Sequence, residues 1–103
     1  MAEVTVVYWR DIPAQVIVGR GRKAVKAPLS ERFEQAIDRA AMKAGLAGTD
    51  DYLAQWRKAA PITVEGSDAD AAASTAAGIE HVYNLERLKQ LIAAGGLEPT
   101  DPE

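Results

Sequence analysis

The sequence predicts an α+β fold with a small three-stranded, mainly antiparallel sheet and helices packed on one face. Three observations lead to this prediction. Two runs of β-branched and aromatic residues flank a short polar break near the N-terminus, amphipathic helical patterns follow, and one short alternating segment separates two pairs of helices. The predicted order of elements is therefore β-β-α-α-β-α-α.

The first two strands are predicted over residues 3–10 and 14–20. Both alternating faces of the first are largely apolar, which indicates a central strand or one covered on both sides. Pro13 has no N–H to donate to a strand ladder, so we expect it in the turn or at the first position of the second strand. Residues 19–28 combine glycines with basic residues and are predicted to form the main loop.

A helix is predicted from the N-cap residue Ser30 to Gly45. Its apolar positions recur at helical spacing, and Ile37 stands at the centre of the face that they form. We therefore expect Ile37 to be buried. The apolar face consists of Phe33, Ile37, Ala40, Ala41 and Ala44.

Thr49 predicts the start of a second, short helix that ends before Pro61. We expect this helix to bury Trp56; the alternative is that Trp56, with Arg57 and Lys58, stacks on a base or another flat ligand. The alternating residues 62–65 predict the third strand, at an edge of the sheet.

Two further helices are predicted in the C-terminal part. Ser67 and Asp70 resemble a capping box ahead of the alanine-rich residues 71–77. Asn84 starts the last helix, which Gly95 and Gly96 end. We expect a single domain over residues 1–96 and a flexible acidic tail over residues 97–103. The expected buried stripe of the last helix consists of Leu85, Leu88, Leu91 and Ile92.

Composition excludes several classes of function. The chain of 103 residues has no cysteine, so its own residues form no disulfide, thiolate nucleophile or iron–sulfur site. Its single histidine, His81, cannot build a histidine-rich metal site, and we expect no metal and no cofactor. No secretory signal or membrane-spanning run is readable, and the absence of cysteine fits the cytoplasm.

Charge is distributed unevenly along the chain. The net charge of −3 gives no general reason to expect nucleic acid as a partner. Residues 1–43 nevertheless carry eight basic and five acidic side chains, and the remainder is acidic. This asymmetry can orient a partner or substrate, or the two parts can face each other and cancel.

The basic end is the candidate binding site. Arg10 and Asp11 either form a functional pair for an anion or belong to a turn in which the arginine lies over Trp9. The glycine-rich basic segment that follows lacks the pattern of a nucleotide-binding loop, so it is either a general anion- or partner-binding loop or a solvated loop. The predicted binding residues are Trp9, Arg10, Asp11, Gln15, Arg20, Arg22, Lys23 and Lys26.

The segment Tyr8-Trp9-Arg10-Asp11-Ile12-Pro13, with the matching residues around it, resembles a family of small bacterial domains labelled "virulence factor". The resemblance covers about residues 3–65. The resemblance implies a domain that in some members is attached to larger helical-repeat proteins, and stand-alone relatives that accompany enzymes of tetrahydrofolate and corrinoid methyl transfer. The label implies no chemistry, and the resemblance carries over no catalytic residue.

We therefore expect a non-enzymatic, cytoplasmic protein-interaction module or accessory subunit. Its partner would be another protein that meets the turn over residues 9–15 and the loop over residues 20–26. The alternative is a small subunit of an enzyme complex, in tetrahydrofolate- or corrinoid-linked methyl transfer, that binds an anionic small molecule through the basic loop.

Overall fold

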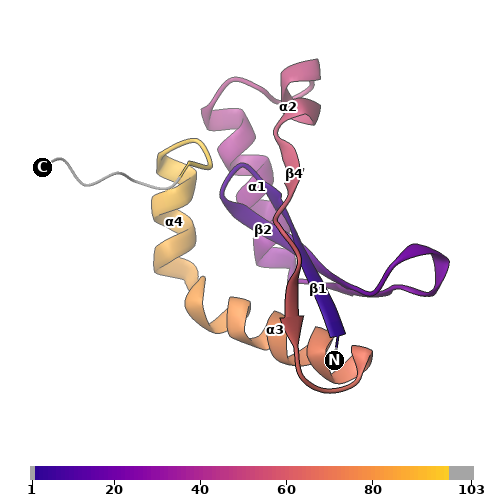
Figure 1. Ribbon diagram of the computed structural model, residues 1–103. Helices are drawn as coiled ribbons and strands as arrows, with labels where there is room; N and C mark the ends of the chain where they lie inside the picture. Colours follow the sequence, from indigo (N-terminus) through magenta and orange to yellow (C-terminus); the bar gives the residue numbers. More distant parts are fainter. Residues whose placement is uncertain (1, 98–103) are drawn as a thin grey trace, which may run out of the picture.

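The fold is an antiparallel sheet with one central strand, and helices pack against this sheet (Figure 1). The computed structural model describes residues 2–97 and confirms the α+β class. The central strand β1 (Ala2–Trp9) pairs with β2 (Ile12–Val18), which pairs with β3 (Val25–Pro28). Along its other edge, β1 pairs with β4 (Trp56–Lys58) near its end and with β5 (Ile62–Val64) near its start.

The β1–β2 ladder contains one irregularity. Val7 pairs with Gln15 but Tyr8 pairs with Pro13, so Ala14 is an extra residue in β2. Bulges are places where a strand tolerates proline, because the regular ladder of N–H donors is interrupted there. Pro13 therefore lies inside β2, fully buried, rather than in the turn or at the first strand position.

The sheet has five strands where the sequence predicted three. The predicted loop over residues 19–28 contains a short 3-10 turn, η1 (Gly21–Lys23), followed by β3. Strand β4 comes from residues that were expected to be helical. The short helix α2 (Asp50–Ala54) ends before Trp56, which pairs with Trp9 as the first residue of β4. The expectation of a buried helical Trp56 was wrong, because Trp56 belongs to a strand and is 38% exposed.

Three longer helices complete the fold: α1 (Glu31–Lys43), α3 (Asp68–Val82) and α4 (Leu85–Ala93). The predicted caps of α2, α3 and α4 are confirmed, since the side chains of Thr49, Ser67 and Asn84 accept backbone N–H bonds. Ser30 precedes α1 as predicted but makes no such bond. Its hydroxyl instead donates to the Glu80 carboxylate across 2.8 Å, which ties the start of α1 to α3.

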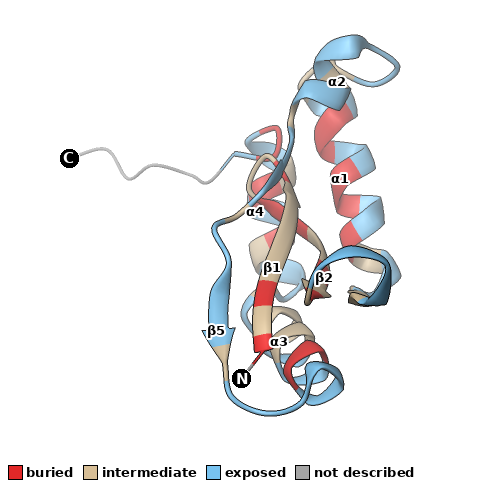
Figure 2. Ribbon diagram, turned by 45° about the vertical axis from the view of Figure 1, so that its right-hand side comes forward, coloured by how far each residue is buried: buried red, intermediate tan, exposed pale blue. Residues whose placement is uncertain are grey.

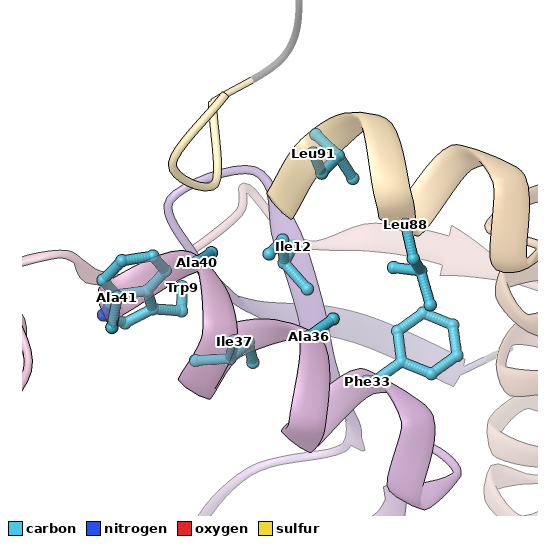
Figure 3. Packing of buried hydrophobic residues seen from close by; sticks show 9 residues of the cluster. All are labelled: Trp9, Ile12, Phe33, Ala36, Ile37, Ala40, Ala41, Leu88 and Leu91. Carbon is cyan, nitrogen blue, oxygen red and sulfur yellow. The ribbon is translucent and has the colours of Figure 1, made fainter. Parts of the chain in front are cut away.

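Two apolar clusters form the core. In the first, α1 and α4 enclose the tip of the β1–β2 hairpin, and Ile37 is buried there as predicted (Figure 3). Leu88 and Leu91 of α4 join it, whereas Leu85 is 62% exposed and does not belong to the buried stripe as expected. In the second cluster, the α3 residues Ala71 and Ala72 pack against Val4, Val16 and Val18 of the sheet.

The face of the sheet opposite α3 is lined by a separate set of side chains. Residues paired across strands point to the same face, and neighbours along a strand point to opposite faces. Val4, Val16 and Val18 therefore face α3. The alternating residues share the opposite face, here called the open face: Thr5, Val7, Gln15, Ile17, Lys26, Pro28 and Lys58.

The predicted acidic tail lies outside the described residues, except for exposed Leu97. None of the helices within residues 2–97 has the length and apolar character that a membrane span requires. The segment that carries β5 and the start of α3 is largely exposed (Figure 2).

Candidate functional site

The turn between β1 and β2 is a structural junction. Arg10 has a φ of 52°, an uncommon left-handed backbone conformation for a residue with a side chain. Its guanidinium donates to the Gln55 side chain across 3.2 Å and to the Gly95 carbonyl across 3.0 Å. The same group lies 5.4 Å from the centroid of the Trp9 ring. The side chain of Arg10 is thus occupied in joining three segments of the chain.

Asp11 forms an ion pair with Arg57 of β4. The carboxylate accepts from the Arg57 guanidinium across 3.2 Å, and its backbone N–H donates to the Gly96 carbonyl across 2.8 Å. Arg57 also lies over the ring of Tyr8, at 4.5 Å from its centroid. These contacts anchor β4 to the hairpin, and the turn alternative for Arg10 and Asp11 describes the geometry better than a free anion-binding pair.

Trp9 is a core residue. Its side chain has no exposed area, and its indole N–H donates to the Tyr52 carbonyl across 2.9 Å. Substantial packing of Trp9 was predicted and is confirmed. The ring offers no surface to a partner, so we leave Trp9 out of the binding surface proposed below.

The predicted basic residues separate into two groups. Arg20 and Lys26 line a hollow of about 400 Å³ on the open face, together with Lys58 of β4. Arg22 and Lys23 are exposed in η1 and are absent from its lining. We call this space the basic hollow; its other lining residues include Glu3, Thr5, Ile17 and Gly19.

Arg20 is already paired within the molecule. Two of its nitrogens donate to the two carboxylate oxygens of Glu3, each across 3.0 Å. The hydrogen bonds from Arg20 lower the pKa of the Glu3 carboxyl, and those to Glu3 raise the pKa of the guanidinium. Because the Arg20 side chain is 82% exposed and that of Glu3 is 38% exposed, solvent screens the pair and its contribution to stability is small.

Lys26 and Lys58 supply the available positive charge of the basic hollow. Lys26 is paired with Ile17 across the β2–β3 ladder, and Lys58 with Val7 across the β1–β4 ladder. Both ammonium groups are exposed, and among residues 2–97 neither has an ion-pair partner. The half-buried Thr5 and Ile17 form the floor between them. The hollow can therefore hold an anionic group beside an apolar contact.

Lys58 was not among the predicted site residues. The sequence offered only the pair Arg57-Lys58 after Trp56, which gave no sign of a strand beside β1. Pairing with Val7 places Lys58 across the basic hollow from Lys26, which lies 32 positions earlier in the chain. Gln15 lies on the same face, outside the basic hollow.

Within the described part of the chain, no group of three or more histidine, cysteine or acidic residues is placed to hold a metal ion. The lining side chains supply cations, one engaged carboxylate and apolar groups, which is an arrangement suited to binding.

The family comparison agrees with the resemblance seen in the sequence. Residues 7–92 match the model of a family described as "Virulence factor". The chain belongs to this virulence factor family. The match runs beyond residue 65 and includes α3 and all but the last residue of α4, so the helices that complete both apolar clusters are part of the family domain. No curated protein and no solved structure matches the chain.

Proposed function

We propose that this virulence factor family domain is a non-enzymatic interaction module that binds an acidic segment of a partner protein on its open face. The observation that carries the proposal is the placement of Lys26 and Lys58 on either side of the floor formed by Thr5 and Ile17. An exposed, half-apolar surface bordered by unpaired cations suits a partner that brings both acidic and apolar side chains.

The rest of the fold supports this use of the open face. The buried side of the sheet is filled by α3, and the hairpin tip is enclosed by α1 and α4. The open face keeps half-buried apolar residues beside charged ones. We place the module in the cytoplasm as part of the proposal, since a sequence without cysteine fits a reducing compartment.

A second candidate is the small subunit of an enzyme complex, which would hold an anionic small molecule in the basic hollow. The volume of about 400 Å³ is within the range of small-ligand sites. We favour the protein partner because the hollow is a broad part of a sheet face, whereas small-ligand sites enclose most of their ligand.

Charge reversal tests whether the basic hollow or the exposed η1 turn binds the partner. The double variant Lys26→Glu with Lys58→Glu changes the basic hollow, and Arg22→Glu with Lys23→Glu changes the same net charge outside it. Each tagged protein is used to capture partners from the native host, and captured proteins are quantified by mass spectrometry. We expect a stoichiometric partner with the wild type and the Arg22/Lys23 variant, and its loss with the Lys26/Lys58 variant.

Equal capture by both double variants would contradict the proposal, provided that circular dichroism shows both to be folded. A wild type that captures no stoichiometric protein, yet binds inorganic phosphate through Lys26 and Lys58, would support the small-molecule alternative instead.

A further inference from the structure

A second hollow lies where α1 meets the open face. It has a volume of about 310 Å³, and Gln15 and Pro28 contribute its side toward the sheet. Leu29 and Ile37 add apolar wall, and Trp56 adds an aromatic one. We call this space the aromatic groove. Its lining combines apolar side chains, an aromatic ring and polar groups, so a side chain of a partner can occupy it.

The rim of the aromatic groove decides which side chain fits. Glu34 and Asp38 stand one helical turn apart on α1, so their carboxylates border the same side of the groove. Both are exposed, and among residues 2–97 neither takes part in an ion pair or a side-chain hydrogen bond. The pKa of the nearby Tyr52 hydroxyl is raised by burial and, after that, by the charges of Asp38 and Glu34.

An aromatic ring beside two carboxylates is complementary to a cation on an apolar stem. The Trp56 ring can receive an ammonium or guanidinium group on its face, while the carboxylates neutralise the charge. The methylene groups of lysine and arginine fit against apolar walls such as Leu29 and Pro28. A free inorganic cation would leave the apolar walls without a contact.

The two hollows lie next to each other along the same strands. Gln15 lines the aromatic groove, and Ile17, two residues further along β2, lines the basic hollow. In the same way, Pro28 and Lys26 of β3 line the aromatic groove and the basic hollow, respectively. Because side chains two residues apart share a face, an extended segment lying along β2 can reach both hollows with alternating side chains.

We propose that the aromatic groove receives a lysine or arginine side chain of the same partner segment whose acidic side chain lies in the basic hollow. The inference rests on the proposed function and specifies the partner: an extended segment with a basic and an acidic residue two or four positions apart. The spacing follows from the alternation of side chains along the strands that line both hollows.

The test uses two blocked octapeptides in a background of serine and valine. Each carries one arginine and one glutamate, two positions apart in the first peptide and four positions apart in the second. One control peptide has citrulline in place of arginine, and a second has glutamine in place of glutamate. Binding to the ¹⁵N-labelled chain is followed by NMR through the indole N–H of Trp56 and the backbone N–H groups of Lys26 and Lys58. The buried indole N–H of Trp9 reports whether each protein is folded.

We expect the Trp56 indole signal to move with the arginine peptide and to move much less with the citrulline peptide. The double variant Glu34→Gln with Asp38→Asn should weaken binding of the arginine peptide by about tenfold, the size expected for loss of charge-assisted bonds. The control Glu31→Gln removes one charge from the same helix, outside the groove. It should leave the affinity unchanged.

The outcomes distinguish the two proposals. Equal Trp56 shifts with the arginine and citrulline peptides, or full affinity in the Glu34/Asp38 variant, would overturn the inference about the aromatic groove. In that case a response of Lys26 and Lys58 that requires glutamate would still support binding at the open face. A Trp56 shift that requires arginine, without any response of Lys26 and Lys58 to glutamate, would support the aromatic groove and contradict the acidic partner segment. If up to about 5 mM peptide moves none of these signals, both proposals fail, because even weak peptide binding is measurable in that range.

Discussion

The indole N–H of Trp9 donates a hydrogen bond to the backbone oxygen of Tyr52 across 2.9 Å. The rings of the two residues also meet, with centroids 5.5 Å apart. This contact holds the end of α2 against β1 immediately before the chain enters β4. It therefore helps to place Trp56 at the aromatic groove and Lys58 at the basic hollow.

Trp9→Phe should lower the free energy of unfolding by about 2–3 kcal/mol, because it removes buried volume and leaves the Tyr52 carbonyl without this donor. Urea denaturation followed by circular dichroism measures the loss. The matched control, Trp56→Phe, changes a partly exposed ring and should cost less than about 1 kcal/mol. A larger loss for Trp56→Phe than for Trp9→Phe would mean that the packing of the two rings has been assigned wrongly.

Gly96→Ala should destabilise the chain by about 2 kcal/mol or more, since it combines left-handed backbone strain with overpacking. Gly96 has a φ of 92°, and a Cβ atom at this position would lie 2.7 Å from Cζ3 of Trp9. Gly21 is the matched control, because its φ is 69° but a Cβ atom there would meet nothing within 4 Å. Gly21→Ala should therefore show the strain alone, about 1 kcal/mol. Thermal or urea unfolding measures both losses. Equal losses of unfolding free energy in Gly96→Ala and Gly21→Ala would show that Gly96 is not closely packed on Trp9.

Ile37→Ala should cost about 2–5 kcal/mol, because it leaves a cavity between α1 and the hairpin tip. Met42, on the same helix, is 70% exposed, so Met42→Ala should change the free energy of unfolding by less than about 0.5 kcal/mol. Denaturant unfolding of both variants tests the orientation of α1. A loss below about 0.5 kcal/mol for Ile37→Ala would show that the helix buries another face.

The Glu3 carboxyl should titrate below its ordinary pKa, because the Arg20 hydrogen bonds favour its charged form. The small stabilisation from this pair is present above the unfolded-state pKa of about 4.3 and is lost as the pH falls through the folded-state pKa. Side-chain NMR of the carboxyl group measures the value directly. Arg20→Gln should return it toward the ordinary range, whereas Arg22→Gln should not; an unchanged pKa in Arg20→Gln would show that the pair does not form in solution.

The sequence predicted the elements whose signals are local. The side chains of Thr49, Ser67 and Asn84 cap helices because short polar residues satisfy free N–H groups wherever a helix begins. The burial of Ile37 followed from helical spacing in the same way. These features depend on neighbours within a few positions of the chain.

The features that the sequence did not predict depend on residues far away in the chain. Trp56 follows Tyr52 at helical spacing, but pairing with Trp9 draws it into β4. Strand β3 is short, lies within a basic glycine-rich segment and ends at Pro28, so only its pairing with β2 defines it. Arg20 and Lys26 were identified as candidates, whereas the position of Lys58 in the same hollow depends on the β1–β4 ladder and has no local signal.

Site-specific photo-crosslinking tests the central claim, that the open face is the binding surface, most directly. A benzophenone amino acid replaces Thr5, on the floor of the basic hollow, in one variant and the exposed Lys89 of α4 in another. Both proteins are expressed in the native host, irradiated and analysed by mass spectrometry. We predict one discrete crosslinked partner from position 5 and none from position 89. A partner crosslinked from position 89 and not from position 5 would contradict the claim and place the binding surface on the C-terminal helices.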